Sequence, residues 1–153
     1  MADNFTIDFK GLDKDLATVI NKYPDETEKF MRKEASRWKK DCNDNGYGKY
    51  TGATQKSRFK KKGVEKKIKP ISKCWKTVKE ENIWHQVNEV QIKNTSKIFN
   101  LLENGHVKWL FGKNTGGYVP GKHWAEKTRE EWRDKFPSDV KDHVDDMLGR
   151  HNL

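Results

Sequence analysis

The feature that most constrains the fold of this 153-residue chain is a long apolar stripe near its C-terminus. After His123, the side chains that could face a core recur mostly every four residues, at Trp124, Thr128, Trp132, Phe136, Val140, Val144 and Met147. This step follows the helical period of about 3.6 residues, so these side chains share one helical face. The stripe predicts a long amphipathic helix that must pack against another element. Pro137 lies inside the stripe and should kink or divide the helix.

Composition limits the size of the core that this helix can cover. Hydrophobic residues make up 33% of the chain and charged residues 36%, and much of the apolar area lies in six Trp, seven Phe and four Tyr. Large aromatic side chains each bury a great deal of surface, so a few of them can form a thin core. We therefore expect a single domain over residues 1–153, with contacts between subunits completing its core.

The N-terminal part should contain one strand and two helices. A short strand is predicted in "NFTIDFKGL", where apolar and polar residues alternate at Phe5, Ile7 and Phe9. A short helix follows, with Asp13 at its N-cap position, and ends near Pro24. A second helix begins at Pro24 and should stop by residues 43–48. Its apolar face steps by four, three and four residues, through Met31, Ala35, Trp38 and Cys42.

The middle of the chain is expected to form a β-hairpin and a short helix. Two β-rich runs, "PISKCWKTV" and "IWHQVNEVQIK", flank "KEEN" at residues 79–82, which we interpret as the hairpin turn. A short helix capped by Asn94 or Thr95 should end at Gly105, with Ile98, Leu101 and Leu102 on one side. Residues 111–121 are predicted to be a turn-rich loop. The expected class is α+β, with an antiparallel hairpin-based sheet and the C-terminal helix packed on it.

A basic segment interrupts this pattern. Residues 47–69 have no apolar period and should form a long loop or arm, and eight of the fourteen residues from 56 to 69 are Lys or Arg. The net charge of the chain is +9. We expect the arm to be mobile in the monomer and ordered only in an assembly. Its candidate contact residues, for an acidic protein partner or for DNA, are Lys56, Arg58, Lys60, Lys61, Lys62, Lys66 and Lys67.

Histidines and carboxylates raise the question of a metal or acid–base site. Glu103, His106 and His123, with His85 as a fourth ligand, do not have the spacing of a recognised metal motif. The alternative is a structural corner in which Glu103 accepts hydrogen bonds from backbone amides of the neighbouring glycine loop and the two nearer histidines flank it, half-buried. No Ser or Cys lies in a nucleophile pattern. We expect no catalytic residue, cofactor or metal.

Targeting and redox features are sparse. The N-terminus lacks the pattern of a signal peptide, and no apolar run is long enough for a membrane helix, so we expect a soluble protein made in the cytoplasm. Cys42 and Cys74 lie far apart and lack Cys-x-x-Cys spacing, which favours two reduced, partly buried thiols over a disulfide.

Three short motifs occur in a suggestive order around the predicted hairpin. "TGATQKS" precedes it, and "IKNTSKIFNLLENGH" and then "GGYVPGKHWAEKTREE" follow it. In this order the chain resembles the tail-component or neck (gene-product-ten-like) family of long-tailed bacteriophages. The matching residues are Thr51, Gly52, Ser57, Glu103, Asn104, Gly105, His106, Val119, Pro120, Gly121 and His123. The chain departs from the family pattern at Ala53, where a larger apolar residue is usual, and in its enlarged lysine arm.

The resemblance implies a structural virion protein without catalytic residues. It would form a homo-oligomeric ring, with six subunits expected, at the neck or top of the tail, where it would meet head-closure or connector and tail-tube or tail-terminator proteins. DNA would pass through the ring without sequence-specific binding. In this family the corner would consist of Glu103, Asn104, Gly105, His106, Pro120, Gly121 and His123. The alternative is a small basic DNA-binding protein that uses the 56–69 arm.

Overall fold

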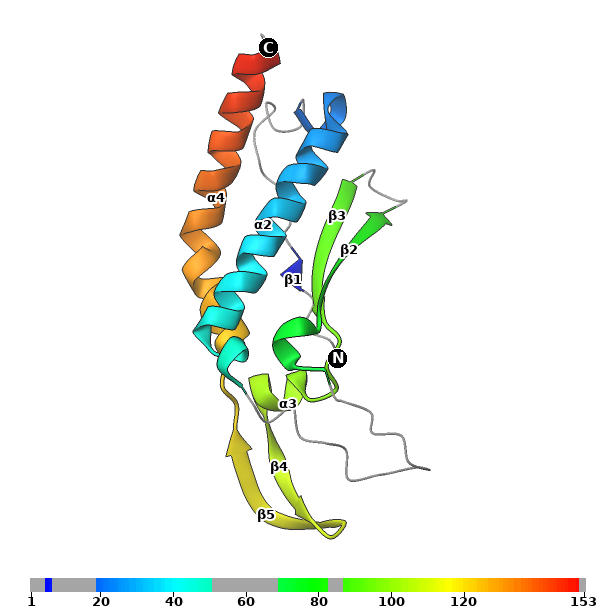
Figure 1. Ribbon diagram of the computed structural model, residues 1–153, viewed down its shortest axis with the longest axis vertical. Helices are drawn as coiled ribbons and strands as arrows, with labels where there is room; N and C mark the ends of the chain where they lie inside the picture. Colours follow the sequence, from blue (N-terminus) through cyan, green and yellow to red (C-terminus); the bar gives the residue numbers. More distant parts are fainter. Residues whose placement is uncertain (1–4, 7–18, 51–68, 83–86, 152–153) are drawn as a thin grey trace.

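The fold is a mixed α+β domain, in agreement with the predicted class (Figure 1). A computed structural model describes residues 5–6, 19–50, 69–82 and 87–151. Residues 19–22 are helical. The other elements, in chain order, are β1 (Phe5–Thr6), α2 (Pro24–Asn45), the 3-10 helices η1 (Tyr47–Lys49) and η3 (Ile71–Lys73), β2 (Trp75–Asn82), β3 (Val87–Asn94), α3 (Phe99–Asn104), β4 (Gly105–Leu110), β5 (Lys113–Pro120) and α4 (Trp124–His151).

The main sheet is antiparallel and has the strand order β1-β3-β2. The predicted N-terminal strand is present, and Phe5 lies opposite Ile92 of β3; the rest of its predicted range falls outside the described residues. The predicted hairpin is also present, but the position of its turn was wrong. The "KEEN" segment at 79–82 forms the end of β2 and pairs with β3 as far as Asn82 opposite Val87. Polar residues can extend a strand because the ladder bonds use the backbone alone.

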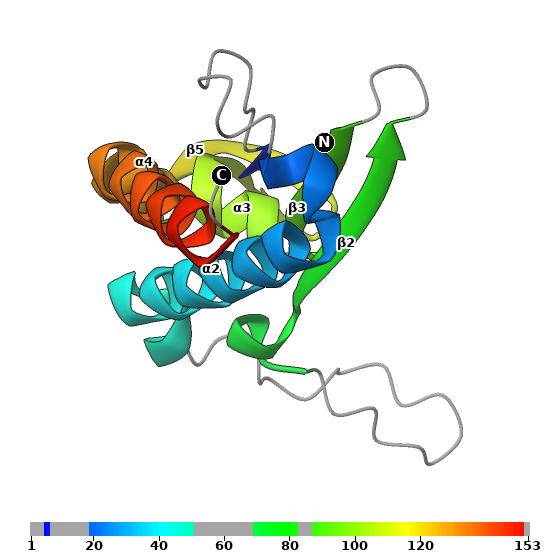
Figure 2. The same cartoon turned by 90° about the horizontal axis from the view of Figure 1, so that it is seen from above.

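The two long helices lie on the same side of this sheet (Figure 2). The predicted face of α2 is confirmed, because Met31, Ala35, Trp38 and Cys42 are all buried. They share one core cluster with side chains of β3 and α4, among them Val90, Ile92, Ala125 and Trp132. This cluster attaches the C-terminal helix to the sheet, as predicted.

Helix α4 runs through Pro137 without a break. The sequence predicted that this proline would kink or divide the helix, and the prediction of a divided helix was wrong. Buried residues on both sides of the proline explain why the helix continues: Trp132 belongs to the first core cluster, and Val140 belongs to a second. Packing on both sides offsets the backbone hydrogen bond that proline cannot make. The second cluster consists of Val19, Val140, Val144 and Met147.

The segment between α3 and α4 differs most from the expectation. Residues 111–121, predicted to be a loop, belong largely to β5, which pairs with β4 as a second, two-stranded antiparallel sheet. In α3, Leu101 is exposed, whereas Phe99 supplies the buried aromatic side chain. The predicted end of α3 at Gly105 is confirmed, since this glycine follows the helix with a positive φ of 82°.

Both cysteines are free and buried. Burial raises the pKa of the Cys42 thiol to about 12, so the group stays protonated at neutral pH. Within the described ranges, no helix is long and apolar enough to cross a membrane. The basic candidates of the 56–69 arm up to Lys67, together with the motif residues Thr51, Gly52 and Ser57, lie outside the described residues.

Replacing Trp132 by alanine should lower the free energy of unfolding by about 3 to 5 kcal/mol, as truncation of a buried aromatic residue does. Trp132 is buried, and its indole N–H donates to Asp41 Oδ2 at 2.8 Å. Urea unfolding followed by circular dichroism measures the change. Arg133→Ala, at the exposed neighbouring position, is the control and should stay within about 0.5 kcal/mol of the parent protein. A loss below about 1 kcal/mol for Trp132→Ala would contradict a core role for the stripe.

Candidate functional site

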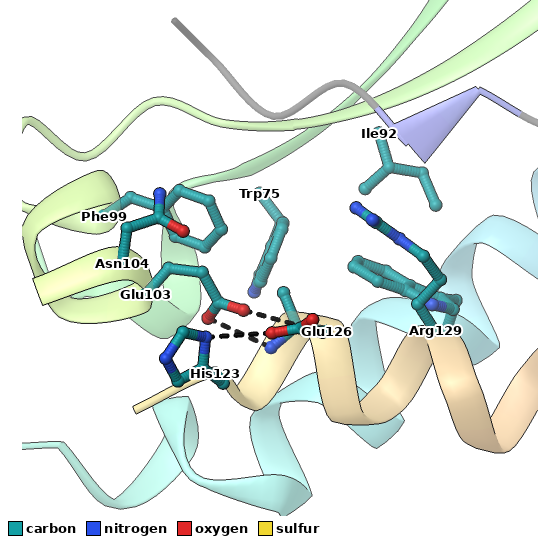
Figure 3. A pocket seen from close by; sticks show the side chains of 10 residues that line it. Trp75, Ile92, Phe99, Glu103, Asn104, His123, Glu126 and Arg129 are labelled. Atoms are coloured by element: carbon teal, nitrogen blue, oxygen red, sulfur yellow. Dashed lines mark hydrogen bonds and ion pairs between the residues drawn. The ribbon is translucent and has the colours of Figure 1, made fainter. Parts of the chain in front are cut away.

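The corner predicted from the sequence is organised around the carboxylate of Glu103, near the end of α3. Glu103 is only 3% exposed, and three hydrogen-bond donors of the protein surround its carboxylate. The backbone N–H of Ala125 donates to Oε2 at 3.1 Å and that of Glu126 donates to Oε1 at 2.8 Å. The hydroxyl of Tyr47 donates to Oε2 as well. Figure 3 shows Glu103 facing the start of α4.

The two amides belong to the first turn of α4. The first N–H groups of a helix have no partner within the helix, and an acceptor side chain just before the helix usually satisfies them. Here the acceptor comes from another helix, 22 positions earlier in the chain than Ala125. A negative charge at this end also interacts favourably with the helix dipole. Glu103 therefore caps α4 and ties it to α3. The sequence had predicted an amide acceptor, but with the amides of the glycine loop.

Backbone contacts close the corner around this carboxylate. The N–H groups of Lys122 and His123 donate to the carbonyl oxygens of Leu102 and Glu103, at 2.7 and 3.2 Å. Gly121 is required by this approach, because a Cβ there would lie 2.2 Å from the Glu103 carbonyl oxygen. The end of α3 and the segment before α4 are thus held side by side.

The same corner forms the base of the β4–β5 hairpin. Gly105 and Pro120 are paired residues at the first position of β4 and the last of β5. The hydroxyl of Tyr118 donates to the carbonyl oxygen of Asn104 at 2.7 Å. His106 is half-buried, as predicted, and its Nδ1 lies 3.5 Å from the Leu101 carbonyl oxygen. The hairpin therefore leaves the domain from a fixed base.

His123 does not flank Glu103 as the half-buried residue that the sequence suggested. Its side chain is 56% exposed, and Nδ1 lies 2.9 Å from Glu126 Oε2. The backbone of His123 has a positive φ of 53°, which directs the chain into α4. Among the described residues, no group of three His, Cys, Asp or Glu side chains could hold a metal ion. His85 lies outside those residues.

A cavity of about 320 Å³ lies beside the corner (Figure 3). Its apolar lining comes from five different elements, with Trp38 of α2, Trp75 of β2, Ile92 of β3, Phe99 of α3 and Ala125 of α4. Its polar lining comes from Glu103, Asn104, His123, Glu126 and Arg129. The Glu103 carboxylate beside it already accepts three hydrogen bonds, so its oxygens serve the fold as acceptors.

Tyr47 is the part of the site that sequence reasoning missed. Its ring is fully buried and lies within 5.0 to 5.8 Å, centroid to centroid, of the rings of Trp75, Phe99 and Trp124. Gly46 lets the Trp124 ring approach, because a Cβ there would lie 2.1 Å from it. The sequence did contain a hint of this role, because Tyr47 is an aromatic residue inside a glycine-rich turn directly after a helix. A loop that is exposed to solvent does not require an aromatic residue at such a place.

Similarity to known proteins does not assign this chain to a family: no protein-family model, curated protein or solved structure matches it. The resemblance to phage neck proteins therefore rests on its motifs alone.

Replacing Glu103 by glutamine should lower the free energy of unfolding by about 1.5 to 3 kcal/mol, the usual cost of losing hydrogen bonds to a charged group. The amide keeps the size of the side chain but puts an N–H₂ group against backbone N–H donors. Tyr47→Phe removes one donor and should cost about 0.5 to 1.5 kcal/mol. Glu130→Gln, on the exposed side of α4, is the matched control and should change little. Urea unfolding measures the three losses of stability, which should be largest for Glu103→Gln and smallest for Glu130→Gln. A Glu103→Gln variant as stable as the control would contradict the capping role.

Proposed function

We propose that this chain is a structural subunit of the head-to-tail joining region of a long-tailed bacteriophage. It acts as a neck, tail-completion or tail-terminator protein, and six copies form a closed ring. In the virion, the ring lies between head-closure or connector proteins and the tail tube. Its action is shape complementarity without a chemical step, and DNA passes through the ring.

The observation that carries this proposal is the role of the Glu-Asn-Gly-His corner. The motifs at 103–106 and 119–123, which underlie the resemblance, meet in space at the base of a projecting hairpin (Figure 1). The carboxylate among them is engaged in capping α4. Such a corner supports a part of the chain that is presented to a neighbour, which is what an assembly subunit requires.

A second candidate function, DNA binding, is favoured by the density of positive charge between residues 56 and 69. Neutralising phosphates releases counterions, so such binding would weaken steeply with salt. Assembly through apolar and shape contacts would depend on salt much less. The two functions therefore differ in how strongly the interaction depends on salt concentration.

Two observations test the proposal. Electron microscopy of the purified full chain should show closed rings with a central channel, and sedimentation should give one assembled species that persists as salt rises. The genes on either side of its own should encode capsid, connector or tail-tube proteins. A monomer that binds DNA only at low salt would favour the second candidate.

Neutralising the arm with Lys60→Gln, Lys61→Gln and Lys62→Gln together should leave the unfolding midpoint unchanged while slowing ring assembly or lowering the yield of joined particles. Exposed ion pairs contribute at most about 1 kcal/mol each, so these charges would guide docking more than hold it. Circular dichroism measures the unfolding midpoint, sedimentation velocity measures ring assembly, and particle counts give the yield of joined particles. Lys127→Gln, Arg129→Gln and Arg133→Gln on α4 remove the same charge elsewhere and serve as the control. Normal assembly with loss of DNA retention alone would assign the arm to DNA.

A further inference from the structure

The β4–β5 hairpin exposes most of the large apolar side chains that the described residues leave in solvent. Phe111 is 98% exposed and Trp109 is 65% exposed, and Val107, Leu110 and Tyr118 are also exposed. The hairpin projects at one end of the long axis of the molecule, beyond the helices and the main sheet (Figure 1). Several large exposed apolar side chains gathered on one hairpin are typical of a surface that another molecule covers.

The hairpin also lacks support from a larger sheet. In the described part of the chain, β4 and β5 pair only with each other. A two-stranded ribbon is marginally stable in water on its own, and three or more strands or packing on a helix usually stabilise it. Its fixed base supplies part of that support, but its tip has none within the described residues.

The turn at the tip contains an unusual residue. Phe111 and Gly112 join the two strands with φ values of 49° and 76°, the sign that a two-residue type I′ turn requires at both central positions. Asn, Asp or Gly is favoured at the first position, whereas a bulky side chain with positive φ is strained. An exposed phenylalanine therefore gives the turn no local benefit. Its benefit must come from a contact outside the monomer.

A surface complementary to this hairpin lies on the same chain. Between Gly105 and Pro120 the only Lys, Arg, Asp or Glu side chains are those of Lys108 and Lys113. In α4, residues 139–146 include four Asp and one Lys. Asp139 and Asp146 pair with Arg37 and Arg150 of the same chain, at 3.1 and 2.7 Å, whereas Asp142 and Asp145 are exposed and supply the acidic groups of this segment. α4 forms the second core cluster there together with Val19, and half-buried apolar side chains pack against that cluster, among them Ile20, Tyr23 and Leu148. The lysines and apolar side chains of the hairpin thus complement the aspartates and apolar side chains at the C-terminal half of α4.

The two complementary surfaces lie at opposite ends of the molecule. The hairpin extends from the N-terminal end of α4, and the acidic segment lies toward its C-terminal end (Figure 1). A helix of 28 residues is about 42 Å long, so the hairpin cannot fold back onto its own acidic segment while its base stays fixed. The surfaces can meet only between copies.

We infer that the β4–β5 hairpin of one copy docks on the C-terminal half of α4 in the next copy. This inference rests on the proposed ring and names the contact that builds it. A contact between different patches is heterologous, and a ring forms when the rotation between copies closes. Trp109 and Phe111 anchor the interface, because aromatic side chains in interface centres dominate binding energy. The lysines and aspartates fix which end meets which.

The experiment uses two variants of the full chain, each with one damaged surface. The hairpin variant combines Trp109→Ser and Phe111→Asn; asparagine tolerates positive φ, so the turn should remain intact. The helix variant combines Asp142→Lys and Asp145→Lys. Leu101→Ser replaces an exposed apolar residue outside the hairpin and is the control. Circular dichroism and thermal unfolding establish that each variant is folded.

Sedimentation velocity and native mass spectrometry should give rings for the parent chain and for the control, and monomers for each damaged variant. The concentration for half-assembly of the hairpin variant should rise at least about 100-fold, because two anchors are lost. An equal mixture of the two variants retains one intact hairpin and one intact helix surface. It should therefore form a one-to-one dimer and nothing larger, which only a head-to-tail contact predicts.

The failures of the two proposals are distinguishable. A parent chain that stays monomeric at high concentration overturns both the ring and the docking contact. Rings that persist in the hairpin variant overturn the docking inference alone, and loss of DNA retention in those rings would make the hairpin a nucleic-acid contact instead. Two monomeric variants that do not dimerise when mixed would overturn the head-to-tail arrangement.

Discussion

The capping of α4 by Glu103 is the interaction on which the arrangement of this protein depends. One buried carboxylate joins α3, the turn after α2 and the longest helix, through the hydroxyl of Tyr47 and two helix amides. A buried carboxylate without these donors would be costly, and a helix start without an acceptor would leave amides unsatisfied. Each group therefore removes the cost of burying the other. The shared bonds fix where α4 begins and from which point the hairpin projects.

The thin core likewise depends on a few large side chains, each of which contacts several elements. The ring of Tyr47 packs against aromatic side chains from β2, α3 and α4, while its hydroxyl reaches Glu103. Farther along the helix pair, Phe30 and Phe136 pack against both core clusters. A few large side chains therefore connect the two helices to the main sheet, while the β4–β5 hairpin projects at one end of the molecule (Figure 1).

The base and the tip of the β4–β5 hairpin have different surroundings. The glycines at 105 and 121 allow close backbone approach at the base of the hairpin, where a side chain would collide with neighbouring atoms. At the tip, by contrast, Phe111 and Gly112 have no crowding around them, and Phe111 is almost fully exposed. The hairpin is thus held by hydrogen bonds at its base and exposes an apolar side chain at its tip, which is the arrangement that the proposed contact between copies would use.

The sequence by itself determined the elements whose side chains follow a regular period. The stripe from Trp124 to Met147, the buried face of α2 and the end of α3 at Gly105 were all predictable, because local spacing and backbone freedom decide them. Tertiary structure decided the rest. The cap joins residues 22 apart, and the Tyr47 bond joins residues 56 apart, distances that no local pattern encodes. β5 pairs with β4 through backbone bonds across a turn with an unfavourable phenylalanine, so the polar, glycine-rich sequence of β5 resembled a loop.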